Sequence, residues 1–299
     1  MNAPVSTAAF QAERFDTLVM RAFAAEPSRH TRDRLIAEVR SGRHDGLLLR
    51  AAEGLDSLPE AEERRAAINT IDFAFEPLVL PSLSLAQAQA YCTGVERSLR
   101  LGDASGLDRP GPLWVDTVHH ACVFSVLFQF SAHLAQVRSC DRIVLLHQGA
   151  RPEPRLGVVA NLAARLLRVQ PVSLPLRGAW FKDLAAIATP RTLIFSMADM
   201  PALAFPAASR RTPAQVDLFT AEGIHRRVDV VAGSAVLAKR LCANHLVLDY
   251  PQPDRIRLAP YDPGRPPACP LVDWVFWPIL VGAHPAGIAT ITSASEVRP

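Results

Sequence analysis

The spacing of hydrophobic residues divides the chain into two parts. Between Phe15 and Phe23, apolar side chains recur at intervals of three and four residues, which is typical of one helix face. Residues 73–83 are apolar but interrupted by Pro77 and Pro81, so we predict a connecting segment there. The first 84 residues therefore form a predicted helical lobe, in which the sequence shows nothing catalytic. Further helices are predicted over residues 32–40, 62–68 and 85–101.

From residue 113 onward, short apolar runs alternate with helical segments. This alternation is typical of an α/β fold with a mostly parallel sheet. We predict an α/β domain over residues 85–299, with a central sheet flanked by helices and the helical N-terminal lobe of residues 1–84 packed on it. The predicted strands cover residues 113–118, 142–146, 171–176, 192–196, 228–231, 245–250 and 256–258, and the predicted helices cover 121–137, 158–169 and 234–242.

Composition narrows the classes of function. The 299-residue chain carries a net charge of +3 and few aromatic residues. A mild positive excess without a basic-aromatic ladder argues against a nucleic-acid partner, and it is compatible with an anionic substrate. The sequence has no GxGxxG or GxxxxGK loop, so no nucleotide cofactor is predicted.

The cysteines and the hydropathy pattern bear on the environment of the protein. The five cysteines include no CxxC pair, and the histidines lack metal-ligand spacing, so we predict no metal site. Widely spaced cysteines favour a reducing, cytoplasmic setting. No apolar stretch reaches the roughly 18 residues of a spanning helix, and the N-terminus lacks a signal-peptide pattern. We expect no transmembrane segment and leave peripheral membrane contact open.

Two adjacent histidines, His119 and His120, follow the predicted strand 113–118 and precede an apolar helix. The carboxyl ends of strands in α/β sheets are where ligands bind, and either imidazole is suited to act as a general base near neutral pH. The alternative is that one ring packs in the core while the other occupies a surface turn.

Cys122 is a second candidate in the same stretch. It follows His119 by three residues, a spacing that brings two side chains to one face of a helix. A Cys–His pair there would support a thioesterase-like or acyl-enzyme route. The alternative is a buried, inert cysteine.

Four blocks follow one another in the order of a known family. They are the His119 stretch TVHHACVF, the block GAWFKD that begins at Gly178, the strand LIFSMAD that ends at Asp199, and the helix–strand pair of residues 234–250. Over residues 85–260 this succession resembles the glycerolipid and lipid A acyltransferase superfamily. The resemblance implies a His general base that activates an acceptor hydroxyl or amine.

The resemblance departs from the family at the acid of its His-x4-Asp/Glu signature. With His119 as the base, position 124 is Phe124, so the carboxylate must come from elsewhere. Asp116 would share a face with His120 if the strand continued. Asp199 ends another predicted strand, and the ends of parallel strands converge. Both acids are candidates.

The resemblance also implies residues that hold the acyl donor. Gly178, Phe181 and Lys182 match the family's Gly-x-x-Phe-x-Asp block, and Arg210 and Arg211 are candidates to bind a phosphate of the donor. The donor would be an acyl-CoA or an acyl-carrier-protein thioester used as substrate, with no resident cofactor and a small-molecule acceptor. Such an enzyme would serve lipid or natural-product biosynthesis.

Three hypotheses thus remain open from the sequence. The first is a cytoplasmic acyltransferase that uses a His base. The second is a relative of such enzymes that has lost its catalytic pair and works as a binding or partner subunit. The third is a Cys-dependent, thioesterase-like enzyme that uses Cys122.

Overall fold

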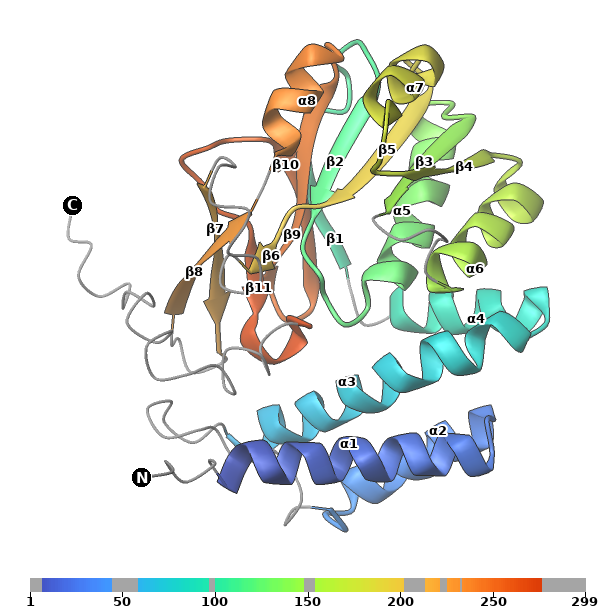
Figure 1. Ribbon diagram of the computed structural model, residues 1–299, viewed down its shortest axis with the longest axis vertical. Coiled ribbons are helices and arrows are strands. Elements are labelled where there is room, and N and C mark those ends of the chain that lie inside the picture. Colours follow the sequence, from blue (N-terminus) through green and yellow to red (C-terminus); the bar gives the residue numbers. More distant parts are fainter. Residues whose placement is uncertain are drawn as a thin grey trace.

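The computed structural model describes residues 7–44, 59–96, 100–147, 154–201, 213–220, 225–231 and 233–275. Within these ranges the predicted α/β architecture is confirmed, with a central, mostly parallel sheet between helices (Figure 1). The described helices are α1 (Thr7–Ala25), α2 (Arg29–Arg40), α3 (Glu60–Leu78), α4 (Leu85–Glu96), α5 (Val123–Val137), α6 (Pro154–Leu162), α7 (Trp180–Ile187) and α8 (Ser234–Arg240).

The main sheet of the described chain has seven strands in the order β1-β10-β9-β2-β5-β3-β4. The strands from β9 to β4 run parallel to one another, whereas β10 is antiparallel to β9 and carries β1 at the edge. The strands are β1 (Arg100–Ala104), β2 (Leu113–Thr117), β3 (Arg142–His147), β4 (Gln170–Pro175), β5 (Thr192–Met197), β9 (Asn244–Gln252) and β10 (Arg255–Pro260).

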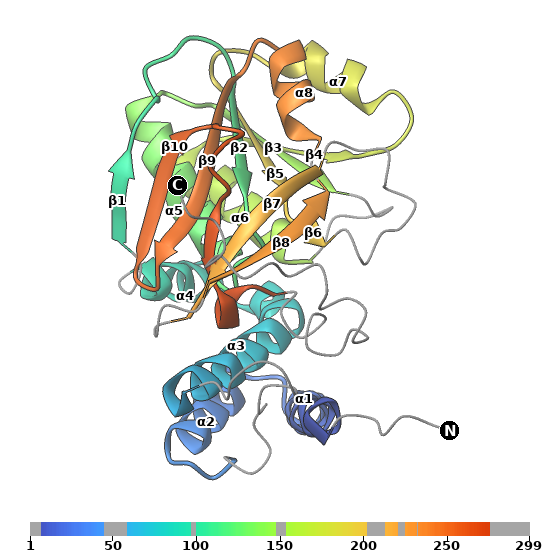
Figure 2. The same ribbon diagram turned by 90° about the vertical axis from the view of Figure 1, so that its left-hand side faces the viewer.

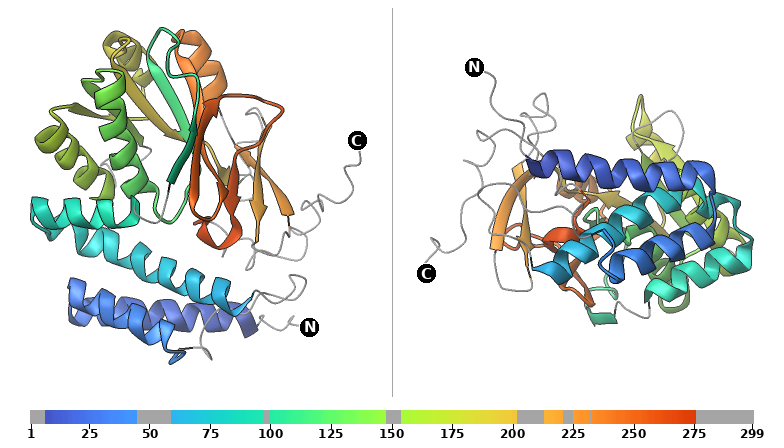
Figure 3. Two further views of the ribbon diagram at one scale, coloured as in Figure 1. Left: turned by 180° about the vertical axis from the view of Figure 1, so that it is seen from behind. Right: turned by 90° about the horizontal axis from the view of Figure 1, so that it is seen from below.

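Strand β2 shows why helices cover both faces of this sheet. All five of its residues are buried, and its side chains alternate between the two faces. Leu113 and Val115 pack in the core that includes side chains of α4, α5 and α6. Trp114 packs on the opposite face with Leu184 of α7 and Ala238 of α8. Figure 3 (left) shows α5 and α6 on one side of the sheet.

A smaller sheet, which the sequence pattern indicated only in part, joins β11, β7, β8 and β6 in that order within the described chain. It stands beside the main sheet in Figure 1 and lies in front of it in Figure 2. Its buried side chains, such as Val216 and Val228, belong to the same large core as β9. Its strands are β6 (Met200–Pro201), β7 (Pro213–Phe219), β8 (His225–Val231) and β11 (Ala268–Pro270).

Helices α1, α2 and α3 form the N-terminal lobe and pack around a core of their own, with Phe23, Ile71 and Phe75 fully or almost fully buried. Of the connecting segment predicted over residues 73–83, the first part, residues 73–78, is instead the end of α3, and the rest, with a short 3-10 helix at Leu80–Ser82, connects α3 to α4. The helix continues through Pro77 and ends at Leu78, because a proline in the last turn interrupts few helical hydrogen bonds. The lobe lies below the sheet in Figure 1, and Figure 3 (right) shows its helices from below.

Candidate active site

The site forms where the neighbouring strands β2 and β5 end. Their register pairs Thr117 with Met197, and the backbone N–H of Ala198 continues the ladder by donating to the Thr117 carbonyl at 3.1 Å. His119 and Asp199 each follow two residues after that last pair. The parallel register therefore brings these two side chains together, although they are 80 residues apart in sequence.

Asp199 holds His119 through both of its carboxylate oxygens. The ring Nδ1–H of His119 donates to Oδ1 at 2.5 Å, and the backbone N–H of the same residue donates to Oδ2 at 2.7 Å. Asp199 is fully buried, while the His119 side chain is 22% exposed. With the proton on Nδ1, the lone pair of the neutral ring lies on Nε2. This arrangement is that of a histidine general base oriented by a carboxylate.

A segment near the end of the described chain completes the surroundings of this pair. The indole Nε1–H of Trp274 donates to Asp199 Oδ2 at 2.7 Å. The backbone N–H of Val275 donates to the carbonyl of His119 at 2.8 Å, and that of Ala121 donates to the carbonyl of Asp273 at 2.7 Å. Residues 273–275 thus pair with the loop that carries the histidines and fix its position.

His120 is turned into the protein and is 1% exposed. Its Nδ1 accepts the backbone N–H of Cys122 at 3.0 Å, and its Nε2 lies 3.4 Å from Asp273 Oδ2. The ring stacks on Tyr250 with a centroid distance of 3.9 Å. These contacts make His120 a support for the loop, and they leave His119 as the better placed base.

Asp273 connects this support to the helical lobe. Arg65 of α3 donates to its Oδ1 through Nε at 2.7 Å, and Asn69 donates to the same oxygen at 2.9 Å. Burial acts to raise the pKa of Asp273, but His120, Arg65 and Asn69 together outweigh burial and hold this pKa below its ordinary value. Asp273 is therefore a buried, charged link between α3 and the histidine loop.

His119 lines an apolar cavity of about 340 Å³, which we call the His119 cavity. Phe124 stands where the resembling family has its acid, and its buried ring lines this cavity. Most of the other lining side chains are apolar too, including Leu127 of α5 and Leu145 of β3. A cavity of this size and lining is suited to a small, largely apolar ligand or to part of a longer one.

Cys122 is not placed beside His119 on one helix face, as the Cys–His hypothesis requires. Helix α5 begins only at Val123, so Cys122 and His119 do not share a helix face as the spacing predicted. Burial raises the pKa of the Cys122 thiol well above its ordinary value, and the charges of Asp273, Asp72 and Glu76 act in the same direction. A thiol held in its protonated form is a poor nucleophile.

Asp116 faces away from the histidine pair. The strand ends at Thr117, so the face that Asp116 and His120 were expected to share does not continue. Asp116 Oδ2 instead accepts His245 Nε2–H at 2.7 Å and the Ser234 hydroxyl at 2.5 Å. Its Oδ1 accepts the Trp114 indole N–H at 3.0 Å and the Ser196 hydroxyl. This buried cluster joins β2, β5, β9 and α8.

The residues predicted to hold the donor lie apart from the His119 cavity. Gly178 has a left-handed φ of +63° in the turn before α7, and Phe181 packs on the opposite sheet face with Trp180. Neither they nor Lys182 line the cavity. Arg210 and Arg211 are outside the described residues.

Sequence reasoning missed the contributions of Arg65, Asn69, Asp273 and Trp274. The bond from Arg65 to Asp273 spans 208 residues, and the bond from Trp274 to Asp199 spans 75. No local spacing marks such a connection. The helical lobe, in which nothing catalytic was expected, therefore supplies side chains that support the histidine loop.

The residues that the structure describes contain no group of three or more His, Cys, Asp or Glu side chains placed to hold a metal ion. Among the same residues, no helix has the length and apolar character needed to cross a membrane.

In comparisons with known proteins, no family model matches the chain, and no curated protein matches it.

Proposed function

We propose that this protein is an acyltransferase that moves an acyl group from a thioester donor to a hydroxyl or amine acceptor, with His119 as the general base. The observation that carries the proposal is the His119–Asp199 pair at the wall of an apolar cavity. An oriented imidazole supplies the base, and the cavity supplies a place for a hydrocarbon chain. The resemblance to acyltransferases suggested the same chemistry from the sequence.

In the proposed reaction, His119 Nε2 removes the proton from the acceptor as its oxygen or nitrogen attacks the thioester carbonyl. The carbon–sulfur bond then breaks, and the leaving thiolate takes the proton from the imidazolium. Asp199 retains its negative charge throughout and stabilises the imidazolium through Nδ1. Asp199 thereby replaces the acid that the family places at the position of Phe124.

The surroundings of the pair suit an acyl donor. Val123, Phe124 and Leu127 line the His119 cavity from the first turns of α5, and removing a chain from water against such residues is favourable by about 0.8 kcal/mol per methylene. The donor is an acyl-CoA or an acyl carrier protein, which is then the partner. All five cysteines are free thiols, which supports a cytoplasmic setting.

A mass-spectrometric screen tests the proposal. The full chain is incubated with acyl-CoA and acyl-carrier donors and with mixed hydroxyl and amine acceptors, and the acylated products are identified. We expect transfer by the native protein and a loss of about 10²–10⁴-fold in His119→Gln and Asp199→Asn. His133→Gln is the matched control, because His133 is a histidine of α5 that does not line the cavity.

The outcomes separate the hypotheses. Full transfer by both His119→Gln and Asp199→Asn would exclude His119 as the base. Loss of transfer in Cys122→Ala, with His119→Gln active, would favour the Cys-dependent hypothesis. A native protein that binds the donors without any transfer or hydrolysis would favour the non-catalytic subunit.

A further inference from the structure

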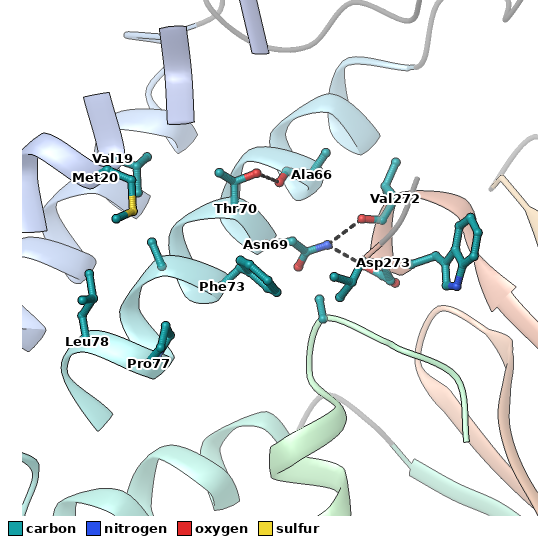
Figure 4. Close-up of a pocket in the computed structure, with 14 residues that line it drawn as sticks. Val19, Met20, Ala66, Asn69, Thr70, Phe73, Pro77, Leu78, Val272 and Asp273 are labelled. Atoms are coloured by element: carbon teal, nitrogen blue, oxygen red, sulfur yellow. Dashed lines mark hydrogen bonds between the residues drawn. The ribbon is translucent and has the colours of Figure 1, made fainter. Parts of the chain in front are cut away.

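A second and larger cavity, of about 460 Å³, lies between the helical lobe and the α/β domain. Helices α1 and α3 form one side of it, and residues 272–275 form the other. Figure 4 shows Met20 and Leu78 at one end of this cavity, Val272 and Asp273 at the other, and Phe73 between them. We call it the interlobe cavity.

Exposed apolar side chains gather around the interlobe cavity. Met20 is 49% exposed, and Phe73 and Leu78 are each 45% exposed, which is unusual for large hydrophobic residues of a packed helical lobe. They come from α1 and from the last turns of α3, and all of them line the cavity. Several solvent-accessible apolar residues around one hollow indicate a site for an apolar ligand.

The polar side chains of the interlobe cavity are engaged within the protein. Asn69 donates to the Val272 carbonyl at 3.0 Å and to Asp273 at 2.9 Å, as the dashed lines of Figure 4 show. The hydroxyl of Thr70 donates to the carbonyl of Ala66 at 3.1 Å. Asp273 is also paired with Arg65. These bonds leave the cavity suited to hydrocarbon and poorly suited to a charged headgroup, whose burial would require new partners.

The two cavities meet. Phe73 and Val275 line both the His119 cavity and the interlobe cavity. A ligand whose polar end reacts at His119 therefore needs only to pass these two side chains for its apolar end to enter the interlobe cavity.

We infer that the interlobe cavity binds the distal part of a long acyl chain whose reactive end lies at His119, and that Phe73 separates the two sections. The placement of the reactive end at His119 rests on the proposed function. The preferred substrates are then long-chain acyl thioesters, because a short chain fills the His119 cavity alone and gains nothing from the lobe. Side chains of α1 and α3 then select the chain length, and they lie apart from the strand ends at which His119 is placed.

Binding of free fatty acids to the full chain tests this inference without requiring catalysis. Calorimetry measures the affinity of octanoate, laurate and palmitate for the native protein and for the variants Met20→Trp and Leu78→Trp. We expect the native affinity to rise from octanoate to palmitate by up to about fourfold for each added methylene that is buried. The larger side chains narrow the interlobe cavity, so both variants should lose about tenfold or more for palmitate and retain the native affinity for octanoate.

Val137→Trp is the control, because Val137 is 53% exposed on α5 and lines neither cavity. Equal native affinities for octanoate and palmitate would overturn the inference, as would native palmitate binding in both Met20→Trp and Leu78→Trp. The same variants are then assayed with the matching acyl-CoA series. If the variants transfer acyl groups with the same chain-length preference as the native protein, the inference about the interlobe cavity is overturned and the proposed reaction is not. Chain-length-dependent binding without transfer supports the interlobe site and counts against the proposed reaction.

Discussion

Two histidine–aspartate pairs, one just beyond the strand ends of the main sheet and one within the sheet, differ in what surrounds them. In one, His119 Nδ1 is 2.5 Å from a carboxylate oxygen of Asp199, and in the other, His245 Nε2 is 2.7 Å from one of Asp116. Both aspartates are buried, with 0% and 4% exposure. The distance between ring and carboxylate therefore does not distinguish a candidate catalytic pair from a structural one.

The difference lies in the hydrogen bonds and in the adjoining space. Asp116 also accepts bonds from Trp114, Ser196 and Ser234, and the His245 ring stacks on Tyr261 at 4.2 Å. The cavity that Asp116 adjoins measures only about 80 Å³. His119, in contrast, lines a cavity of about 340 Å³. A pair is positioned for chemistry when its base faces room for a substrate.

The largest expected effect is the loss of the proposed acyl transfer in His119→Gln, by about 10²–10⁴-fold, because the proposed general base is removed. His245→Gln should retain most of the transfer activity per folded molecule, since His245 lies in the other pair. Initial rates normalised to the folded fraction measure both. Equal losses in the two variants would contradict the distinction between the pairs.

Removal of the Asp116 carboxylate should show the structural role of the second pair. Asp116→Ala leaves Trp114, Ser234 and His245 without their shared buried acceptor, so we expect the free energy of unfolding to fall by about 3–5 kcal/mol. Urea denaturation followed by circular dichroism measures this change. A loss below about 1 kcal/mol would show that the cluster contributes little to stability.

Asp273→Asn should give a smaller and pH-dependent effect. The folded protein lowers the pKa of Asp273, so its contribution to stability is present above the ordinary aspartate pKa and is lost as the pH falls through the lower folded value. We expect Asp273→Asn to lower the free energy of unfolding by about 1–3 kcal/mol at neutral pH. The difference in free energy of unfolding between Asp273→Asn and the native protein should shrink in acid. Denaturation curves recorded at a series of pH values measure this difference. A difference that stays constant into strong acid would argue against a charged Asp273.

Trp274→Phe should have the smallest effect on the His119 pair. The substitution keeps an aromatic ring in the core but removes the N–H that donates to Asp199 at 2.7 Å. With an octanoyl donor, which fills the His119 cavity alone, we expect kcat to fall about tenfold with KM unchanged, because the carboxylate is less well positioned while Trp274 lines only the interlobe cavity. Steady-state kinetics separate these two parameters. A change in KM alone would assign Trp274 to substrate binding.

Much of the fold could be predicted from the sequence because it depends on local spacing. Alternating apolar runs indicated the strands of the parallel sheet, including β2 and β5. Strand β1 was missed, since Arg100–Ala104 holds a single large apolar residue and pairs with β10, more than 150 residues later. Helix α3 was predicted too short, because Pro77 was taken as a break when it lies in the last turn.

The sequence alone determined at which edge of the sheet the candidate catalytic side chains would lie. A histidine pair directly after one parallel strand and an aspartate directly after another must lie at the same edge of the sheet, because parallel strands end together. Which residues pair there was decided only by tertiary structure. The pleat turned Asp116 to the opposite face, the adjacency of β2 and β5 selected Asp199, and residues 273–275 and α3 secured the loop through bonds between distant parts of the chain. The spacing of residues in the sequence does not record contacts of that kind.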